Sequence, residues 1–131
     1  MDLSTKNRKD IGALGERVAC AYLERHGFSL VERNVARKTG ELDLVMRAGD
    51  ILHMVEVKTV LAEELPDDRG VHDEYDPSLN LHEAKLRRVA RTGGWYVAET
   101  GWEGEWQVDG CLVWLRRRDG MARVRYLPQL L

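Results

Sequence analysis

The sequence has few cysteines and no long apolar run, and each scarcity excludes a class of protein. Its two cysteines, Cys20 and Cys111, are far apart, and neither has a Cys or His neighbour at metal-ligand spacing. We therefore expect two buried free thiols rather than a disulfide framework. No stretch approaches the roughly 20 apolar residues that span a bilayer. The N-terminus is too polar for a signal peptide, so we expect a cytoplasmic protein with no membrane partner.

The sequence also lacks an excess of charge of one sign. Its 20 basic and 22 acidic residues give a net charge of −2, whereas proteins that coat nucleic acid without selectivity are strongly basic. The acids concentrate in residues 61–76, which have no consistent period and are predicted to form a mobile loop. That segment contains one arginine, Arg69, and seven acidic residues: Glu63, Glu64, Asp67, Asp68, Asp73, Glu74 and Asp76. The remainder is net positive, which leaves room for a local basic groove.

Hydrophobic periodicity predicts a single α/β domain over residues 1–131. A helix is expected from Asp10 to about His26, where Gly27 stops it. A second helix should begin near residues 77–80, and Gly93-Gly94 either ends or weakens it. Strands are predicted at 28–35, 41–47, 51–59, 108–115 and 122–127. The order α-β-β-β-α-β-β indicates an α/β sandwich with a mixed central sheet flanked by helices.

The second and third predicted strands carry charged residues in an otherwise apolar hairpin. If Gly49-Asp50 is the hairpin loop, Asp43 lies directly opposite Glu56. If Ala48-Gly49 is the loop, Asp43 lies opposite Met54, and Glu56 is the diagonal neighbour of Asp43. Since side chains alternate between the two faces of a strand, both registers put Asp43, Glu56 and Lys58 on one side of the sheet.

Two carboxylates and an amine on one face suggest a metal site. Oxygen ligands suit Mg²⁺ or Mn²⁺, which activate water and neutralise charge on a phosphate. Lys58 beside them could orient the attacking water or stabilise the developing charge. The set suits metal-assisted phosphodiester hydrolysis. On pattern alone, the alternative is a pair of solvent-facing carboxylates with a same-face Glu56–Lys58 ion pair. Glu16, at the border of the first helix's apolar stripe, either reaches this site or is solvated.

Several short motifs occur together in a fixed order: Gly12-Ala13-Leu14-Gly15-Glu16, Arg33-Asn34, Gly40-Glu41-Leu42-Asp43-Leu44-Val45 and Val55-Glu56-Val57-Lys58-Thr59, followed by Pro77, Lys85 and Asp109. The combination resembles the YraN-like family of small bacterial proteins, which is distantly similar to archaeal Holliday-junction resolvases. The resemblance covers nearly the whole chain. It implies a restriction-endonuclease-like PD-(D/E)XK fold that acts on nucleic acid.

Within that resemblance, Glu16, Asp43 and Glu56 stand at the metal-ligand positions and Lys58 at that of the catalytic lysine. Lys85 would face the site or a phosphate. Two features depart from the family pattern: Val60 stands where the family tends to carry Arg, and the 61–76 segment is longer and more acidic.

Other residues are candidates for contacts around the site. Glu41 shares a strand face with Asp43, and Asp109 matches the later part of the family pattern. The basic residues expected to bind nucleic acid are Lys85 and Arg88 on the second helix and Arg116 and Arg117 in a turn, with solvated surface as the alternative. His53 is predicted to be a packed core residue. For the four tryptophans, packing is favoured over base stacking.

Three functions follow from these observations. The leading hypothesis is a Mg²⁺-dependent DNA endonuclease, with branched DNA as a candidate substrate. The second is a nucleic-acid-binding module of nuclease fold with little or no hydrolysis. The third is a protein-interaction domain whose acidic loop docks a basic partner. A homodimer is left open by the sequence.

Overall fold

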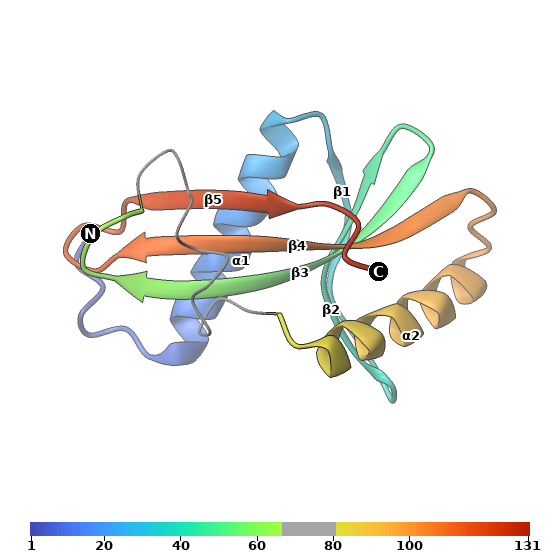
Figure 1. Cartoon of the computed structure of the whole chain (residues 1–131), viewed down its shortest axis with the longest axis horizontal. Coiled ribbons are helices and arrows are strands. Elements are labelled where there is room, and N and C mark those ends of the chain that lie inside the picture. The colour runs from blue at the N-terminus through green and yellow to red at the C-terminus, as the bar shows by residue number, and fades with distance from the viewer. Residues whose placement is uncertain (67–80) are drawn as a thin grey trace.

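Five strands form one mixed sheet with a helix on each face (Figure 1). The computed structural model describes residues 1–66 and 81–131. The elements are α1 (Arg8–Arg25), β1 (Ser29–Arg37), β2 (Gly40–Ala48), β3 (Ile51–Ala62), α2 (Glu83–Thr100), β4 (Glu105–Arg116) and β5 (Ala122–Leu127). The sheet order follows the chain, β1-β2-β3-β4-β5. Only β3 and β4 pair in parallel, because α2 carries the chain from the end of one to the start of the other.

The predicted order of elements is confirmed, and the architecture is consistent with a restriction-endonuclease-like fold. Several boundaries differ: β1 extends to Arg37, β4 begins at Glu105, and β3 enters the predicted 61–76 loop. Strand β3 continues through Leu61 and Ala62, because both residues pair with β4. Residues 67–76 of that loop and positions 77–80, where the second helix was expected to begin, lie outside the described residues. Within the described residues α2 begins at Glu83, after His82 in an extended conformation.

Helix α2 runs through Gly93-Gly94 without interruption and ends at Thr100. A Cβ added to Gly93 would lie 2.7 Å from Cζ3 of Trp106 and 3.1 Å from Cγ of Met54. Glycine at this position lets the helix backbone approach the sheet more closely than any other residue would allow. The close contact offsets the low helix propensity of the pair.

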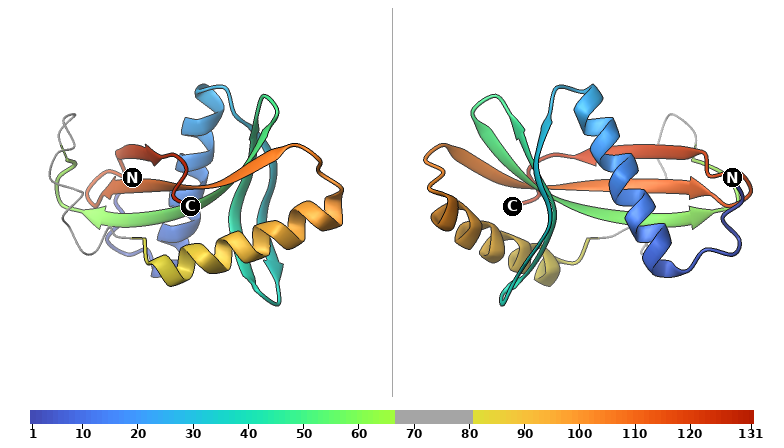
Figure 2. Two further views of the ribbon diagram at one scale, coloured as in Figure 1. Left: turned by 45° about the vertical axis from the view of Figure 1, so that its right-hand side comes forward. Right: turned by 180° about the vertical axis from the view of Figure 1, so that it is seen from behind.

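Each helix covers a separate apolar core, one on each face of the sheet (Figure 2). The α1 side buries Leu44, Met46, Val55 and Val113, and the α2 side buries Val45, Leu52, Met54 and Val108. Strands covered on both faces are apolar on both, which explains the consecutive hydrophobic residues Leu44-Val45-Met46 in β2 and Leu112-Val113-Trp114-Leu115 in β4. Cys20 and Cys111 are buried and free, as predicted. Among the described residues, neither helix combines the length and apolar composition that crossing a membrane requires.

Helix α1 touches the sheet most closely at Gly15. A Cβ there would fall 1.8 Å from Oγ1 of Thr59 on β3, whereas a Cβ at Gly12, on the same helix, meets nothing within 4 Å. We expect Gly15→Ala to lower the free energy of unfolding by about 1–3 kcal/mol through overpacking. Gly12→Ala, its control, should raise it by up to about 1 kcal/mol through helix propensity. Urea unfolding of both variants tests this, and equal effects would contradict the close contact.

Candidate metal centre

The β2–β3 hairpin has the register in which Gly49-Asp50 is the loop. Ala48 pairs with Ile51, and the ladder continues to Leu44 opposite Val55. The regular pairing ends at Leu44, and the next residue along β2 is Asp43. An Oδ2 atom of Asp43 instead accepts a hydrogen bond of 2.9 Å from the backbone N–H of Val57. The Asp43 carboxylate is thereby fixed at the point where β2 separates from β3.

Glu56 is the buried member of the centre, with 2% of its surface exposed. Its Oε1 lies 2.7 Å from Nζ of Lys85, which reaches it from the first turn of α2. Burial, and then the negative charge of Asp43, raise the pKa of Glu56 to about 7, and Lys85 opposes that rise. Burial also raises the pKa of Asp43, while the Val57 N–H opposes it. The two carboxyl groups therefore titrate as a pair.

Glu16 joins this group from α1. Burial, followed by the charges of Asp43 and Glu41, raises the pKa of Glu16 to about 7. The Glu16 side chain is half-buried. The close packing of Gly15 on Thr59 explains how the adjacent residue reaches the β2 carboxylates. The predicted convergence of Glu16, Asp43 and Glu56 is therefore consistent with the side-chain electrostatics.

A hollow of about 220 Å³ gives solvent access to the centre. It is lined by Gly40, Glu41, Asp43, Glu56, Lys85, Arg88 and Val89. Carboxylates from the sheet face cations from α2 across it. A cation could be held on the sheet side while an anionic ligand approaches along the helix side.

The donor set suits a hard divalent cation. Asp43 and Glu56 offer oxygen ligands only, and Mg²⁺ is usually held by one or two carboxylates together with water and substrate oxygens. Within residues 1–66 and 81–131, no group of three or more Asp, Glu, His or Cys side chains is already arranged to hold a metal ion. Lys85 instead provides the positive charge beside Glu56. The residues fit a two-carboxylate Mg²⁺ or Mn²⁺ site in which the metal would compete with Lys85.

Five of the ten residues predicted for the site line this hollow. Glu41, Lys85 and Arg88 line it beside the two central carboxylates. Lys58 is exposed and lies two residues beyond Glu56 on β3, which puts both on the same strand face.

Asp109 does not belong to the site, because its side chain lies on the opposite face of the sheet. It is fully buried and binds Nδ1 of His53 at 2.6 Å, Nε2 of Gln107 at 2.7 Å and the backbone N–H of Gln129 at 2.8 Å. The Tyr126 hydroxyl also donates to it. This network ties β3, β4, β5 and the C-terminal segment together. Asp109 is thus structural, and the prediction of His53 as a packed residue is confirmed.

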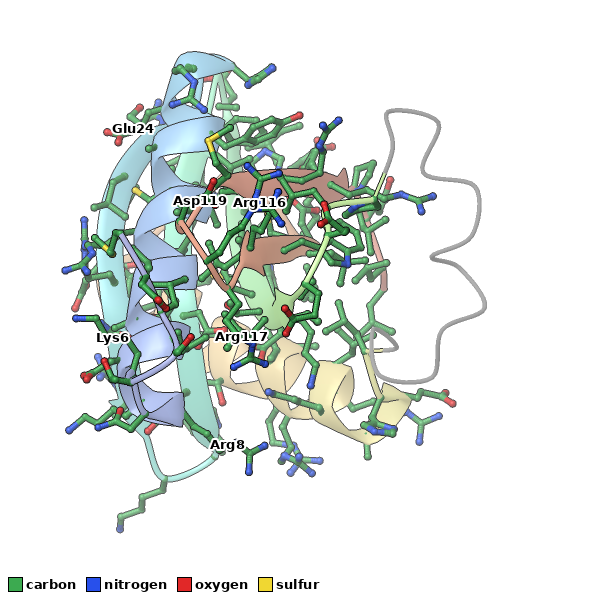
Figure 3. All side chains as sticks on the ribbon, turned by 90° about the vertical axis from the view of Figure 1, so that its left-hand side faces the viewer. Lys6, Arg8, Glu24, Arg116, Arg117 and Asp119 are labelled. Atoms are coloured by element: carbon green, nitrogen blue, oxygen red, sulfur yellow. The ribbon has the colours of Figure 1, made fainter. Side chains whose placement is uncertain are left out.

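Arg116 and Arg117 lie at a different end of the sheet from the centre. Figure 3 shows both at the turn after β4, where Arg116 pairs with Asp119 and Arg117 with Glu63, each at 2.7 Å. Glu56 is level with Gly110, and Arg116 is six residues farther along β4, about 20 Å at 3.3 Å per residue. The structure does not bring these arginines to the hollow, and their binding of nucleic acid stays a prediction.

Thr92 shapes the wall of the site and was not among the residues predicted from the sequence. It is fully buried in α2, and its Oγ1 lies 2.8 Å from Oγ1 of Thr39 in the turn between β1 and β2. The contact holds that turn against the helix. Its position in the apolar stripe, four residues before buried Tyr96, is the signal that could have indicated it.

Comparison with known proteins supports the resemblance. The profile described as "Uncharacterised protein family UPF0102" matches residues 15–121. A UPF0102 protein of Beutenbergia cavernae is 43% identical over 117 residues, covering 89% of this chain and 92% of that one. A UPF0102 protein of Syntrophotalea carbinolica is 35% identical over 124 residues, covering 95% of this chain and 93% of that one. A UPF0102 protein of Campylobacter jejuni is 32% identical over 98 residues, covering 75% of this chain and 78% of that one. The chain belongs to the UPF0102 family, the YraN-like family of its sequence motifs.

Proposed function

We propose that this protein is a Mg²⁺- or Mn²⁺-dependent DNA endonuclease. The observation that carries the proposal is the meeting of Asp43 and Glu56 where β2 leaves β3, with a cationic wall across an open hollow. Asp43 and Glu56 would hold the cation, with Glu16 beside them. When bound, the cation would activate water and neutralise charge on the scissile phosphate.

The basic residues would have two roles, one in the chemical step and one in binding DNA. Lys58, exposed on the Glu56 side of β3, would orient the attacking water and stabilise the charge that develops on the phosphate. Lys85 and Arg88 would contact backbone phosphates next to the hollow. Hydrolysis adds water across one P–O bond and leaves a phosphate monoester and a hydroxyl group. Branched DNA, suggested by the resemblance, is the first substrate to test.

The proposal is tested by incubating the purified protein with branched, single-stranded and duplex DNA in Mg²⁺, Mn²⁺ or EDTA. Asp43→Asn protein, purified in parallel, controls for contaminating nuclease. We expect cleavage only by the unaltered protein and only with metal. Equal cleavage by both preparations, or none on any substrate, would count against hydrolysis at this centre.

A second candidate is a nucleic-acid-binding module that does not hydrolyse its ligand. The 2.7 Å contact of Lys85 with Glu56 favours it, because a permanent ion pair there would exclude a cation. This candidate predicts DNA binding that is the same in EDTA and Mg²⁺ and no cleavage in either. The cleavage assay separates the two functions.

We predict that Lys85→Ala and Arg88→Ala together weaken DNA binding and lower its salt dependence. Removing one phosphate-binding side chain should reduce the slope of log K against log salt concentration by about one. Arg87→Ala is the matched control, since Arg87 is exposed on the same helix but pairs with Glu83 and does not line the hollow. Fluorescence anisotropy at several salt concentrations measures the slopes. An unchanged slope in the double variant would place the DNA elsewhere, with Arg116 and Arg117 the next candidates.

A further inference from the structure

Trp95 has a larger fraction of its surface exposed than the other three tryptophans. It lies on α2 with 58% of its surface exposed, whereas Trp114 is buried and Trp102 and Trp106 are half-buried. Tryptophan is enriched at binding surfaces relative to the rest of the protein surface. The sequence favoured packing for all four tryptophans, and for Trp95 the structure shows otherwise.

Trp95 lines a hollow of about 390 Å³ together with Arg37, Lys38, Thr39 and Glu99. This volume is within the range of small-ligand pockets. Arg37 is held in place by Glu99, which accepts hydrogen bonds of 2.9–3.2 Å from its guanidinium group. Lys38 is exposed at the tip of the same turn. The hollow thus combines an aromatic face with two basic groups and one carboxylate, that of Glu99, which pairs with Arg37. Aromatic faces beside basic groups are how proteins bind single-stranded nucleic acid.

This hollow lies next to the candidate metal centre along α2. The centre lies between the helix and Gly40, and the Trp95 hollow between the helix and residues 37–39, with the Thr39–Thr92 contact between them. Trp95 is ten residues beyond Lys85, about 15 Å along the helix axis. That length corresponds to about four stacked nucleotides at 3.4 Å each. One DNA strand can therefore reach both places.

We infer that Trp95 and the turn formed by residues 37–39 are a stacking subsite for an unpaired nucleobase, placed to guide a single strand into the Asp43–Glu56 centre. In a duplex the faces of the bases are covered by their neighbours, so only an unpaired base can stack on the indole ring. The inference rests on the proposed nuclease function and narrows its substrate to DNA with an unpaired segment or arm.

The test measures binding without cleavage. A labelled oligothymidylate and a duplex of the same length are titrated in EDTA with the unaltered protein, Trp95→Ala, Trp95→Phe and Met121→Ala. We expect Trp95→Ala to weaken single-strand binding about tenfold or more and to change duplex binding less than twofold. Trp95→Phe should keep most of the affinity, because phenylalanine also stacks. Met121→Ala is the matched control, since Met121 is similarly exposed, at 55%, but lines neither hollow.

The outcomes separate this inference from the proposed function. Single-strand affinity that Trp95→Ala leaves unchanged would overturn the subsite even if the protein cuts DNA. Selective loss of that affinity without cleavage on any substrate would support the subsite and reject hydrolysis. Equal weakening on single strand and duplex would also overturn the inference, because a general phosphate contact, and not stacking, would then explain Trp95.

Discussion

Asp43→Asn should make the metal-free protein melt at a higher temperature and should abolish its response to Mg²⁺. Asp43 lies beside Glu56 in the centre, and its negative charge adds to the effect of burial in raising the pKa values of both Glu56 and Glu16. Asparagine removes this charge. Its amide oxygen can still accept the 2.9 Å hydrogen bond from the Val57 N–H, so the backbone contact is kept.

The pH dependence follows from the direction of these shifts. The pKa values of Glu16 and Glu56 rise from an ordinary value of 4.5 to about 7 in the folded protein. A raised folded pKa contributes stability that is fully present below the unfolded value and is lost as pH rises through the folded one. The metal-free protein should therefore lose stability between about pH 4.5 and pH 7, and Asp43→Asn should lose less.

Mg²⁺ should restore this stability in the unaltered protein but not in Asp43→Asn. At tenfold excess over the dissociation constant, ligand binding adds about 1.4 kcal/mol, equivalent to about 5 °C in Tm for a domain of this size. Asp50→Asn is the matched control, because Asp50 is an exposed acid in the loop of the same hairpin. It should behave like the unaltered protein. An Asp43→Asn protein that melts lower in EDTA and still responds to Mg²⁺ would leave Asp43 as an ordinary strand residue.

Lys58→Ala should reduce metal-dependent cleavage at least a hundredfold and leave the fold intact. Removal of one group that stabilises transition-state charge typically costs this much or more. Lys58 is exposed and belongs to neither core, so its loss should change the free energy of unfolding by less than about 0.5 kcal/mol. Lys9→Ala, an exposed lysine at the start of α1, should cleave normally. Initial cleavage rates at saturating Mg²⁺ provide the measurement, and a Lys58→Ala protein as fast as Lys9→Ala would remove Lys58 from the chemistry.

The hairpin could be predicted from the sequence because its geometry is local. Alternation along the strands put Asp43, Glu56 and Lys58 on one side of the sheet in either of two hairpin registers, and the structure has the register with Gly49-Asp50 as the loop. The first helix likewise placed Glu16 at the border of its apolar stripe, from which it reaches the sheet. These features depend on residues close together in the chain.

The features that sequence did not predict depend on distant contacts. Gly93-Gly94 stays helical because Trp106 and Met54 pack against it. The parallel β3–β4 register determines on which face of the sheet the Asp109 side chain lies, and this face is not that of the site. The same register puts Arg116 at the far end of the sheet. The exposure of Trp95 depends on which side of α2 meets the sheet, where Val89, Gly93 and Tyr96 are buried. Local periodicity gives no information on these pairings.

The central claim is that the carboxylates beside the β2–β3 hairpin bind a divalent cation, and calorimetric titration with Mn²⁺ tests it most directly. We expect saturable heats near one ion per chain for the unaltered protein and for Asp50→Asn. Asp43→Asn should give only the heat of dilution, although it remains folded. Matching heats for Asp43→Asn and the unaltered protein would contradict a metal site at Asp43 and Glu56.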